Sequence, residues 1–218
     1  FQLVLVLIFQ SFWVNNMKRI NFKKAGRYII TVIAIVSTFY LPVKASDFDV
    51  PEELQATILL KALSFDSIVI GGNQKVVYIG VIVNPGSNRS VTNMENFVSS
   101  VNSIKKGITF FSKETFLETK PVKAIPINLD SLSDLKKYDI SILYLTEDLK
   151  TLSNVAKYAR DNKTLTLSSE PSYVRNGNAS VSVMTKYNRP ILVINLKNIR
   201  LEGHEIGPQV LKHSEIID

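Results

Sequence analysis

Polar side chains follow four apolar segments that we predict to be strands. These strand-end segments are Asn84-Pro85-Gly86-Ser87, Asn128-Leu129-Asp130, Thr146-Glu147 and Ser168-Ser169-Glu170. In an open sheet of parallel strands, ligands bind beyond the carboxyl ends of the strands. The candidate rim for a ligand or a partner therefore comprises Asn84, Gly86, Ser87, Ser168 and Glu170.

Two interpretations of these segments remain open. The backbone N–H groups of Asn84–Ser87 precede a predicted helix and could hold an anion, although the segment is neither a P-loop nor a G-x-G-x-x-G motif; it is also typical of an ordinary turn. Asp130, Glu147 and Glu170 could converge at the same rim. Acids are equally expected there because each precedes a predicted helix, whose dipole favours negative charge.

The sequence contains few groups of residues that are typical of a catalytic site. The chain has no cysteine, which excludes disulfides, cysteine-bound zinc and thiol catalysis. Its two histidines, His204 and His213, lack the H-x-x-x-H spacing of a helical metal site, and we expect both on the surface. No G-x-S-x-G motif is present, and no histidine is expected near Ser168 and Ser169. We predict a non-enzyme without a metal or cofactor.

The segments that must position the rim are predicted to alternate between strands and helices, as in an α/β domain. The predicted strands are Val76–Val83, Val122–Ile127, Ile140–Leu145 and Thr164–Leu167. The first is continuously apolar and β-branched, as in a parallel sheet buried on both faces, and Pro126 indicates that the second lies near an edge. Predicted helices are Pro51–Asp66, Val91–Lys105 with Thr92 and Glu95 as a capping box, Ser131–Lys137 and Thr146–Arg160. Residues 110–118 are ambiguous between helix and loop.

The pattern changes after Glu170-Pro171, which starts a helical turn or two. Ala179–Met184 alternates and Pro190–Ile194 is apolar, which predicts an antiparallel hairpin turning at Tyr187-Asn188-Arg189. Asn195 should cap a helix that Gly203 ends. Gly207-Pro208 should start a last helix that turns Val210, Leu211 and Ile216 inward. We predict one three-layer α/β domain over residues 46–218, with a mainly parallel sheet, a C-terminal antiparallel hairpin and helices on both faces.

The segment from Met17 to Ala45 is typical of a secretory signal peptide. Five basic residues precede an apolar run, Tyr28–Leu41, and Val43-Lys44-Ala45 resembles a cleavage site, so we expect the cut after Ala45. An uncleaved anchor is the alternative, but the run is shorter than the roughly 20 residues that span a bilayer. Residues 1–16 read as sequence upstream of the true start, or else as an extra membrane segment.

The positive charge of the chain belongs mainly to this leader. The chain holds 26 basic and 19 acidic residues, and six bases but no acid precede Ser46. Residues 46–218 therefore carry 20 bases against 19 acids. This balance argues against a nucleic-acid partner. No basic amphipathic helix is predicted after the cleavage point, so we expect no binding to a membrane surface.

Three blocks together resemble the YfiR-like (YfiR/HmsC-like) family of small bacterial periplasmic proteins. They are VPEELQATILLKALSFD (Val50–Asp66), VVYIGVIVNPG (Val76–Gly86) and the tail from Thr164 to Ile217, which holds SSEPSYV, a hairpin, INL and a final Gln209-Val210-Leu211-Lys212. The resemblance covers nearly all of residues 46–218 and is weakest between Thr109 and Asp139. It consists of fold determinants, so it transfers no site residues.

The resemblance implies a regulator that acts by contact. Family members bind the periplasmic part of an inner-membrane diguanylate cyclase and restrain its output of cyclic di-GMP, which controls biofilm and exopolysaccharide; others serve sensor kinases. Redox control through cysteines, as the family implies, cannot apply to a chain without cysteine.

We therefore expect an exported, periplasmic regulatory protein that docks on the outer domain of a diguanylate cyclase or sensor kinase. A second copy of the chain is a further candidate partner, and no stable membrane insertion is expected after cleavage. The alternative is a periplasmic small-ligand binding protein that uses the strand-end rim. An exported hydrolase is disfavoured because no nucleophile–base pair or metal cluster is apparent.

Overall fold

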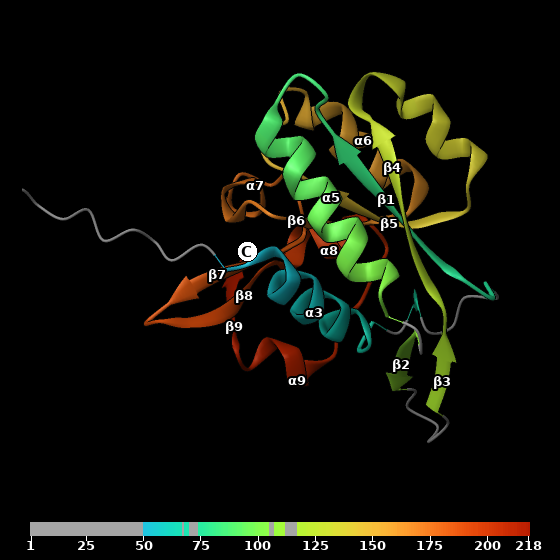
Figure 1. Cartoon of the computed structure of the whole chain (residues 1–218). Coiled ribbons are helices and arrows are strands. Elements are labelled where there is room, and N and C mark those ends of the chain that lie inside the picture. The colour runs from blue at the N-terminus through green and yellow to red at the C-terminus, as the bar shows by residue number, and fades with distance from the viewer. Residues whose placement is uncertain (1–49, 67, 70–73, 105–106, 112–116) are drawn as a thin grey trace, which may run out of the picture. The chain divides into compact units, whose positions relative to one another are not determined.

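A seven-stranded sheet lies at the centre of this computed structural model (Figure 1). Its strands are β1 (Val77–Val83), β4 (Val122–Asn128), β5 (Ile140–Leu145), β6 (Leu165–Ser168), β7 (Val181–Lys186), β8 (Arg189–Asn195) and β9 (Ser214–Ile217). Their spatial order is β4-β1-β5-β6-β7-β8-β9. A separate antiparallel pair consists of β2 (Ile108–Phe111) and β3 (Leu117–Lys120).

The structure describes residues 50–218 except 67, 70–73, 105–106 and 112–116. These residues belong to one unit of the chain, Asp47–Asp218. The upstream segment 1–16 and the predicted signal peptide 17–45 lie outside the described residues, and both remain predictions.

The strand directions confirm a mainly parallel sheet with a C-terminal hairpin. Neighbouring strands from β4 through β1, β5 and β6 to β7 are parallel, and β8 runs antiparallel to β7. The chain moves from β1 outward to β4, which is an edge strand as Pro126 indicated, and then returns to the other side of β1 to form β5. The connections therefore diverge between β1 and β5, where open α/β sheets form a crevice.

Helices cover both faces of the sheet, which confirms the three-layer architecture (Figure 1). The helices are α3 (Glu52–Leu63), α5 (Asn88–Asn102), the 3-10 helix η2 (Leu129–Lys137), α6 (Leu152–Asn162), α7 (Pro171–Arg175), α8 (Leu196–Leu201) and α9 (Pro208–Leu211). One buried cluster joins α3, α5 and α8 to the sheet, and a second joins η2, α6 and α7 to the opposite face.

Alternation along the strands divides the core between the two faces. Ile142 and Tyr144 of β5 point into the first cluster, whereas Leu143 and Leu145 point into the second. Tyr144 stacks on Phe97 of α5 with ring centroids 3.6 Å apart. This stack fixes α5 over the strand ends, where its first turn faces the candidate rim.

Two predicted helix starts, those of α5 and α6, were wrong by several residues, and that of η2 was wrong by two. α5 begins at Asn88 because the Ser87 hydroxyl accepts the N–H of Ser90, and Thr92 lies inside the helix. α6 begins only at Leu152, so Thr146-Glu147-Asp148 form a loop after β5. The η2 helix begins at Leu129 and is of the 3-10 type.

The end of the chain also differs from the prediction. α9 stops at Leu211, and residues 214–217 form β9, which pairs in parallel with β8. Ile216 is therefore 37% exposed and does not point inward. Edge pairing prevails because β8 presents a row of backbone N–H and C=O groups that another strand can satisfy.

Residues 108–120 differ from the prediction as well. The segment 110–118, which was expected to be a helix or a loop, contains the ends of β2 and β3. The two strands pair directly, with Ile108 opposite Lys120.

Candidate functional site

The loops after β1 and β5 are joined by buried hydroxyl groups. The Ser90 and Thr146 hydroxyls lie 2.6 Å apart, and Thr146 Oγ1 donates to the carbonyl of Ile82 at 2.8 Å. Because the single Thr146 proton goes to Ile82, Ser90 must be the donor to Thr146. Ser90 Oγ in turn accepts the N–H of Asn84 at 2.8 Å.

Asp148 completes this connection on the surface. Its carboxylate accepts the Ser87 hydroxyl at 2.7 Å, and its carbonyl accepts the Asn84 amide at 2.9 Å. Asn84 Oδ1 also accepts the N–H of Gly86 at 3.1 Å. The structure thus brings Asn84, Gly86 and Ser87 together, but their polar groups bond to one another and to the β5 loop. The geometry favours the turn interpretation over an anion site.

A cavity of about 430 Å³ lies beside this connection, beyond the carboxyl ends of β5, β6 and β7. It is lined by Val50, Pro51, Glu52, Gln55, Arg89, Glu147, Ser169, Glu170, Pro171, Ser172, Arg175, Val183, Met184 and Thr185. Its position is the one where ligands bind in open α/β sheets.

The predicted rim residues divide between the cavity and its surroundings. Glu170 lines the cavity, but Asn84, Gly86 and Ser87 do not. Ser168 is fully buried, where its hydroxyl accepts the N–H of Glu170 at 2.9 Å and faces the Leu145 carbonyl at 3.4 Å. Its neighbour Ser169 lines the cavity instead. Whether any of the five binds a ligand or partner remains a prediction.

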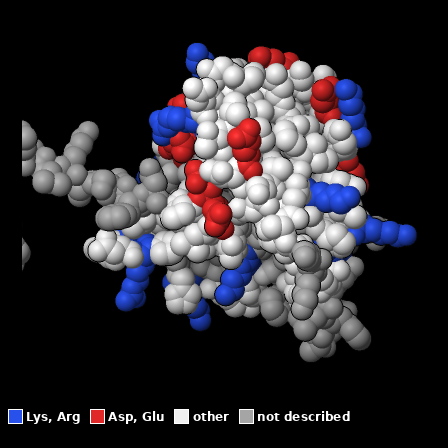
Figure 2. All heavy atoms as spheres, in the orientation of Figure 1, with Lys and Arg blue, Asp and Glu red and all other residues white. Residues whose placement is uncertain are grey.

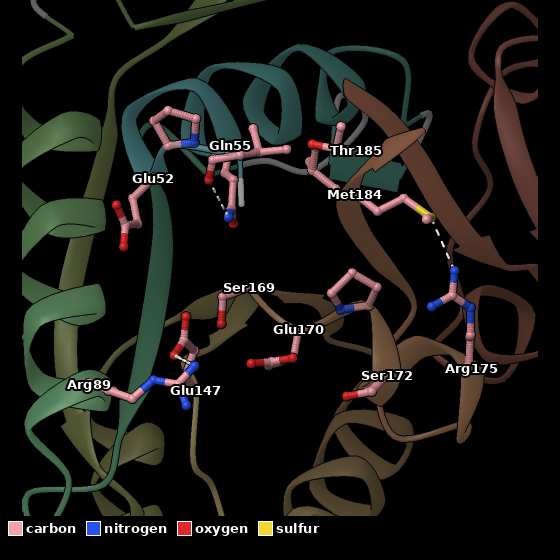
Figure 3. A pocket seen from close by; sticks show the side chains of 14 residues that line it. Glu52, Gln55, Arg89, Glu147, Ser169, Glu170, Ser172, Arg175, Met184 and Thr185 are labelled. Atoms are coloured by element: carbon pink, nitrogen blue, oxygen red, sulfur yellow. Dashed lines mark hydrogen bonds and ion pairs between the residues drawn. The ribbon is translucent and has the colours of Figure 1, made fainter. Parts of the chain in front are cut away.

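Carboxylates and guanidinium groups both line the cavity (Figure 3). Arg89 of α5 forms an ion pair with Glu147 at 2.6 Å, and Arg175 of α7 forms one with Glu215 of β9 at 3.0 Å. Burial raises the pKa of Glu147; the neighbouring Arg89 lowers that pKa, and the nearby Glu170 raises it again, with a net upward shift. The acids here are therefore close enough to repel one another.

Buried polar groups lie along the inner side of the cavity. Gln55 of α3 is 8% exposed, and its amide nitrogen donates to the Val50 carbonyl at 2.8 Å. Gln55 Oε1 has no hydrogen-bond partner among the described residues. The prediction of the rim considered only the residues directly after each strand, so it missed the residues of α3 that line the cavity.

A separate buried cluster contains both His204 and Glu202, and the surface prediction for His204 was wrong. His204 is 6% exposed, with Nδ1 2.7 Å from Asp66 Oδ2 and Nε2 3.1 Å from the Lys163 carbonyl. His213 is exposed, as predicted. Glu202 accepts hydrogen bonds from Thr166 and Ser180.

Among the described residues, no group of three His, Cys, Asp or Glu side chains lies close enough to hold a metal ion. Within the same part of the chain, none of the helices combines the length and apolar character of a membrane span.

A family model confirms the expected resemblance over part of the chain. The model described as YfiR/HmsC-like matches residues 111–215, a region that runs from the end of β2 into β9. A search of curated proteins returned no match.

Two solved structures are similar to this chain. One, titled as the ABC domain in complex with L-Trp from Streptococcus pneumonia, has a TM-score of 0.50 and 16% identity. The other, titled as a conserved domain protein from Vibrio cholerae, has a TM-score of 0.49 and 17% identity. In each case 77% of this chain aligns with 60% of the other. At 16% identity the likeness to the streptococcal structure supports the α/β fold alone.

Proposed function

We propose that this chain, in which residues 111–215 match the YfiR/HmsC-like family, is an exported regulator of cyclic di-GMP signalling. It acts in the periplasm by binding the outer domain of an inner-membrane diguanylate cyclase or sensor kinase. Binding alters the output of that enzyme only if the chain has different affinities for its two conformational states. The family match is the observation that carries this proposal.

The described surface offers features suited to a protein partner. The β7–β8 hairpin projects from the body of the sheet (Figure 1), and Tyr187 at its turn is 90% exposed. Large aromatic side chains are enriched at the centres of protein interfaces. Acidic and basic side chains are interspersed on the face that carries α3 and α5 (Figure 2), which is consistent with a protein partner and with the near-neutral charge after the predicted cleavage point.

The test is made in the source cells. Deleting the gene should change the cyclic di-GMP level, and the full chain should restore it. A chain lacking residues 17–45 should fail to restore it because it would not be exported. A tagged chain should recover a cyclase or a kinase from the envelope fraction. An unchanged cyclic di-GMP level, together with recovery of no signalling enzyme, would contradict the proposal.

A second candidate function is favoured by the cavity. A space of about 430 Å³ at the ends of parallel strands falls within the usual size of small-ligand sites. The similar streptococcal structure was solved with L-Trp, so a protein of this fold can bind an amino acid. Under this proposal the chain is a periplasmic binding protein, and a metabolite from an envelope extract should raise its melting temperature.

A further inference from the structure

We propose that His204 and Asp66 form a pH-dependent conformational switch. While His204 is protonated, it holds Asp66, which follows α3, against residues 203–207; this contact is the junction. Once the proton is lost, the junction opens although the sheet remains folded. The inference goes beyond the proposed functions and depends on no partner or ligand.

The junction lies where the ends of three helices meet. Asp66 follows α3, Lys163 is the residue after α6, and Glu202 is the residue after α8. The His204 ring bonds to the Asp66 carboxylate and to the Lys163 carbonyl. α3 and α8 cover one face of the sheet and α6 covers the other. One imidazole ring therefore connects helices of both layers, and the negative carbonyl end of a helix favours a cation.

The two bonds of the ring require a proton on each nitrogen. A carboxylate and a carbonyl both accept, and only the imidazolium has two donors. A neutral His204 would turn a lone pair toward one of these acceptors. It would also leave the Asp66 carboxylate, which is 0% exposed, without its cation. An unpaired buried charge is strongly destabilising, so loss of the proton favours an opening that returns Asp66 to water.

The junction can open separately from the sheet. Its backbone contributes an isolated β-bridge at Asp66, where the Gly207 N–H donates to the Phe65 carbonyl at 3.1 Å. Asp66 Oδ1 also accepts the N–H groups of Ile68 and Val69, so these bonds depend on the same side chain. By contrast, β1 is paired with parallel strands on both sides. Segments with few such pairings open at a lower free energy than central strands.

Other charged groups around the ring do not replace its role. Glu202 is 1% exposed, and its two oxygens accept hydroxyl and backbone N–H groups. The Lys163 ammonium donates to the Leu201 carbonyl at 3.2 Å. Burial lowers the pKa of His204, whereas Asp66, the Lys163 carbonyl and Glu202 raise that pKa, with a net rise. The proton is therefore retained at neutral pH and lost on the alkaline side.

The switch acts on a helix that lines the cavity. The first turn of α3 and the residue before it contribute Pro51, Glu52 and Gln55 to the lining. Asp66 lies at the other end of this helix. Opening of the junction would remove one attachment of α3, so the pH of the surroundings would act on an element of the cavity wall.

The first measurement is the NMR spectrum of the imidazole nitrogens in the purified, nitrogen-15-labelled full chain. At about pH 7, both ring nitrogens of His204 should carry protons. His204 should lose one of them at a higher pH than the exposed His213. A neutral His204 at this pH would overturn the proposal.

The second measurement is amide hydrogen exchange at Ile68, Val69 and Gly207. Their protection, corrected for the intrinsic rate at each pH, should fall by up to about tenfold per pH unit between 6.5 and the raised pKa of His204. It should change little in dilute urea, because a local opening exposes little surface, whereas the protection of β1 should fall steeply. Amides of the β2–β3 pair, which contain no part of the junction, should show no such change with pH.

Asp66→Asn tests the switch without removing the contacts. The amide oxygen can accept the N–H groups of Ile68 and Val69, and the NH₂ group can donate to Nδ1 of a neutral His204, whose Nε2–H still donates to Lys163. The junction of this variant should therefore stay protected, without pH dependence, up to about pH 9. Asp139→Asn, at an exposed position, should behave as the unaltered chain does.

Three further results would overturn the proposal. The first is protection of the junction that does not change with pH, and the second is a urea dependence equal to that of β1, since the junction would then open only on global unfolding. The third is an Asp66→Asn variant that keeps the pH dependence or fails to fold, because its amide should fit a neutral ring. None of these results bears on docking to a signalling enzyme.

Discussion

His204 Nδ1 lies 2.7 Å from Oδ2 of Asp66, a residue 138 positions earlier in the chain, and both side chains are almost fully buried. The other ring nitrogen, Nε2, faces the Lys163 carbonyl at 3.1 Å. A carboxylate and a carbonyl both accept, so both ring nitrogens must carry protons and His204 is an imidazolium. The pair ties the end of α3 to the segment after α8, since Asp66 also accepts the N–H groups of Ile68 and Val69.

Replacing His204 should destabilise the fold. His204→Ala leaves the Asp66 carboxylate buried without its cation, and losing one partner of a buried pair costs about 3 kcal/mol or more. His213→Ala, at the exposed second histidine, should change stability by less than about 0.5 kcal/mol. Urea unfolding of both variants measures the difference. Equal losses would mean that the His204–Asp66 pair contributes little.

Stability should decline as the pH rises through neutrality. Burial alone lowers the pKa of His204, but the Asp66 carboxylate, the Lys163 carbonyl and the nearby Glu202 raise it more, so its pKa lies above the usual 6.5. A pKa raised by folding stabilises the protein fully below 6.5, and the gain is lost as the pH passes through the higher, folded-state value. Melting temperatures from about pH 5 to about pH 9 measure this loss.

Glu202 should also contribute to the loss of stability as the pH rises. Burial raises its pKa above the usual 4.5, although hydrogen bonds from Ser180 and Thr166 lower it in part. The folded state thus favours the protonated acid, and stability from this group falls as the pH rises above 4.5. The decline should be smaller in His204→Ala and unchanged in His213→Ala. A melting temperature that rises steadily with pH would contradict both assignments.

Replacing the Glu202 carboxylate by an amide should destabilise the fold. Its two oxygens accept the Thr166 N–H at 2.9 Å, the Thr166 hydroxyl at 2.7 Å and the Ser180 hydroxyl at 2.6 Å. At a pH above the raised pKa of this group, where Glu202 is a carboxylate, Glu202→Gln turns an NH₂ group toward one of these donors and should cost about 2 kcal/mol. Glu205→Gln, at an exposed position nearby in the chain, is the control. Calorimetric melting of the two variants would reveal a difference, and its absence would refute the network's role.

The Ser90 and Thr146 hydroxyls should be energetically coupled. Their chain runs from the Asn84 N–H through both hydroxyls to the Ile82 carbonyl, at 2.8, 2.6 and 2.8 Å. Ser90→Ala and Thr146→Val should each cost about 1–3 kcal/mol by leaving a buried partner unsatisfied. The double variant should cost less than the sum, with a coupling of about 1 kcal/mol. Simple additivity in the denaturation cycle would show that the two hydroxyls act separately.

A glycine in the turn between β7 and β8 should stabilise the protein. Tyr187 and Asn188 have φ values of 51° and 58° between the paired residues Lys186 and Arg189, which is the geometry of a type I′ turn. Asn188→Gly should stabilise the protein by about 0.5 kcal/mol, whereas Asn188→Val should destabilise it by about 1 kcal/mol or more. Thermal melting of the pair checks the opposite signs. Two shifts of the same sign would argue against this turn.

The elements of the fold were largely predictable from local pattern. Continuous β-branched runs predicted β1 and β5, alternation with Tyr187-Asn188 predicted the hairpin, and Asn195 and Gly203 indicated the limits of α8, where Asn195 accepts the Asn198 N–H and Gly203 has a φ of 74°. These features succeed because hydrophobic period, capping and positive φ are properties of a few neighbouring residues. The position of Glu170 at the cavity was also predictable from the sequence, since strand ends meet at one edge of a parallel sheet.

The sequence by itself therefore determined the layers of the domain, the mainly parallel sheet and the edge of the sheet beside which the cavity lies. The tertiary structure decided that Gln55 Oε1 is buried without a hydrogen-bond partner among the described residues, that His204 is buried against Asp66, and that residues 214–217 leave a helical pattern to pair with β8. Each of these depends on a partner distant in the chain. Burial and pairing are set by the groups that surround a side chain after folding, and local composition carries no record of them.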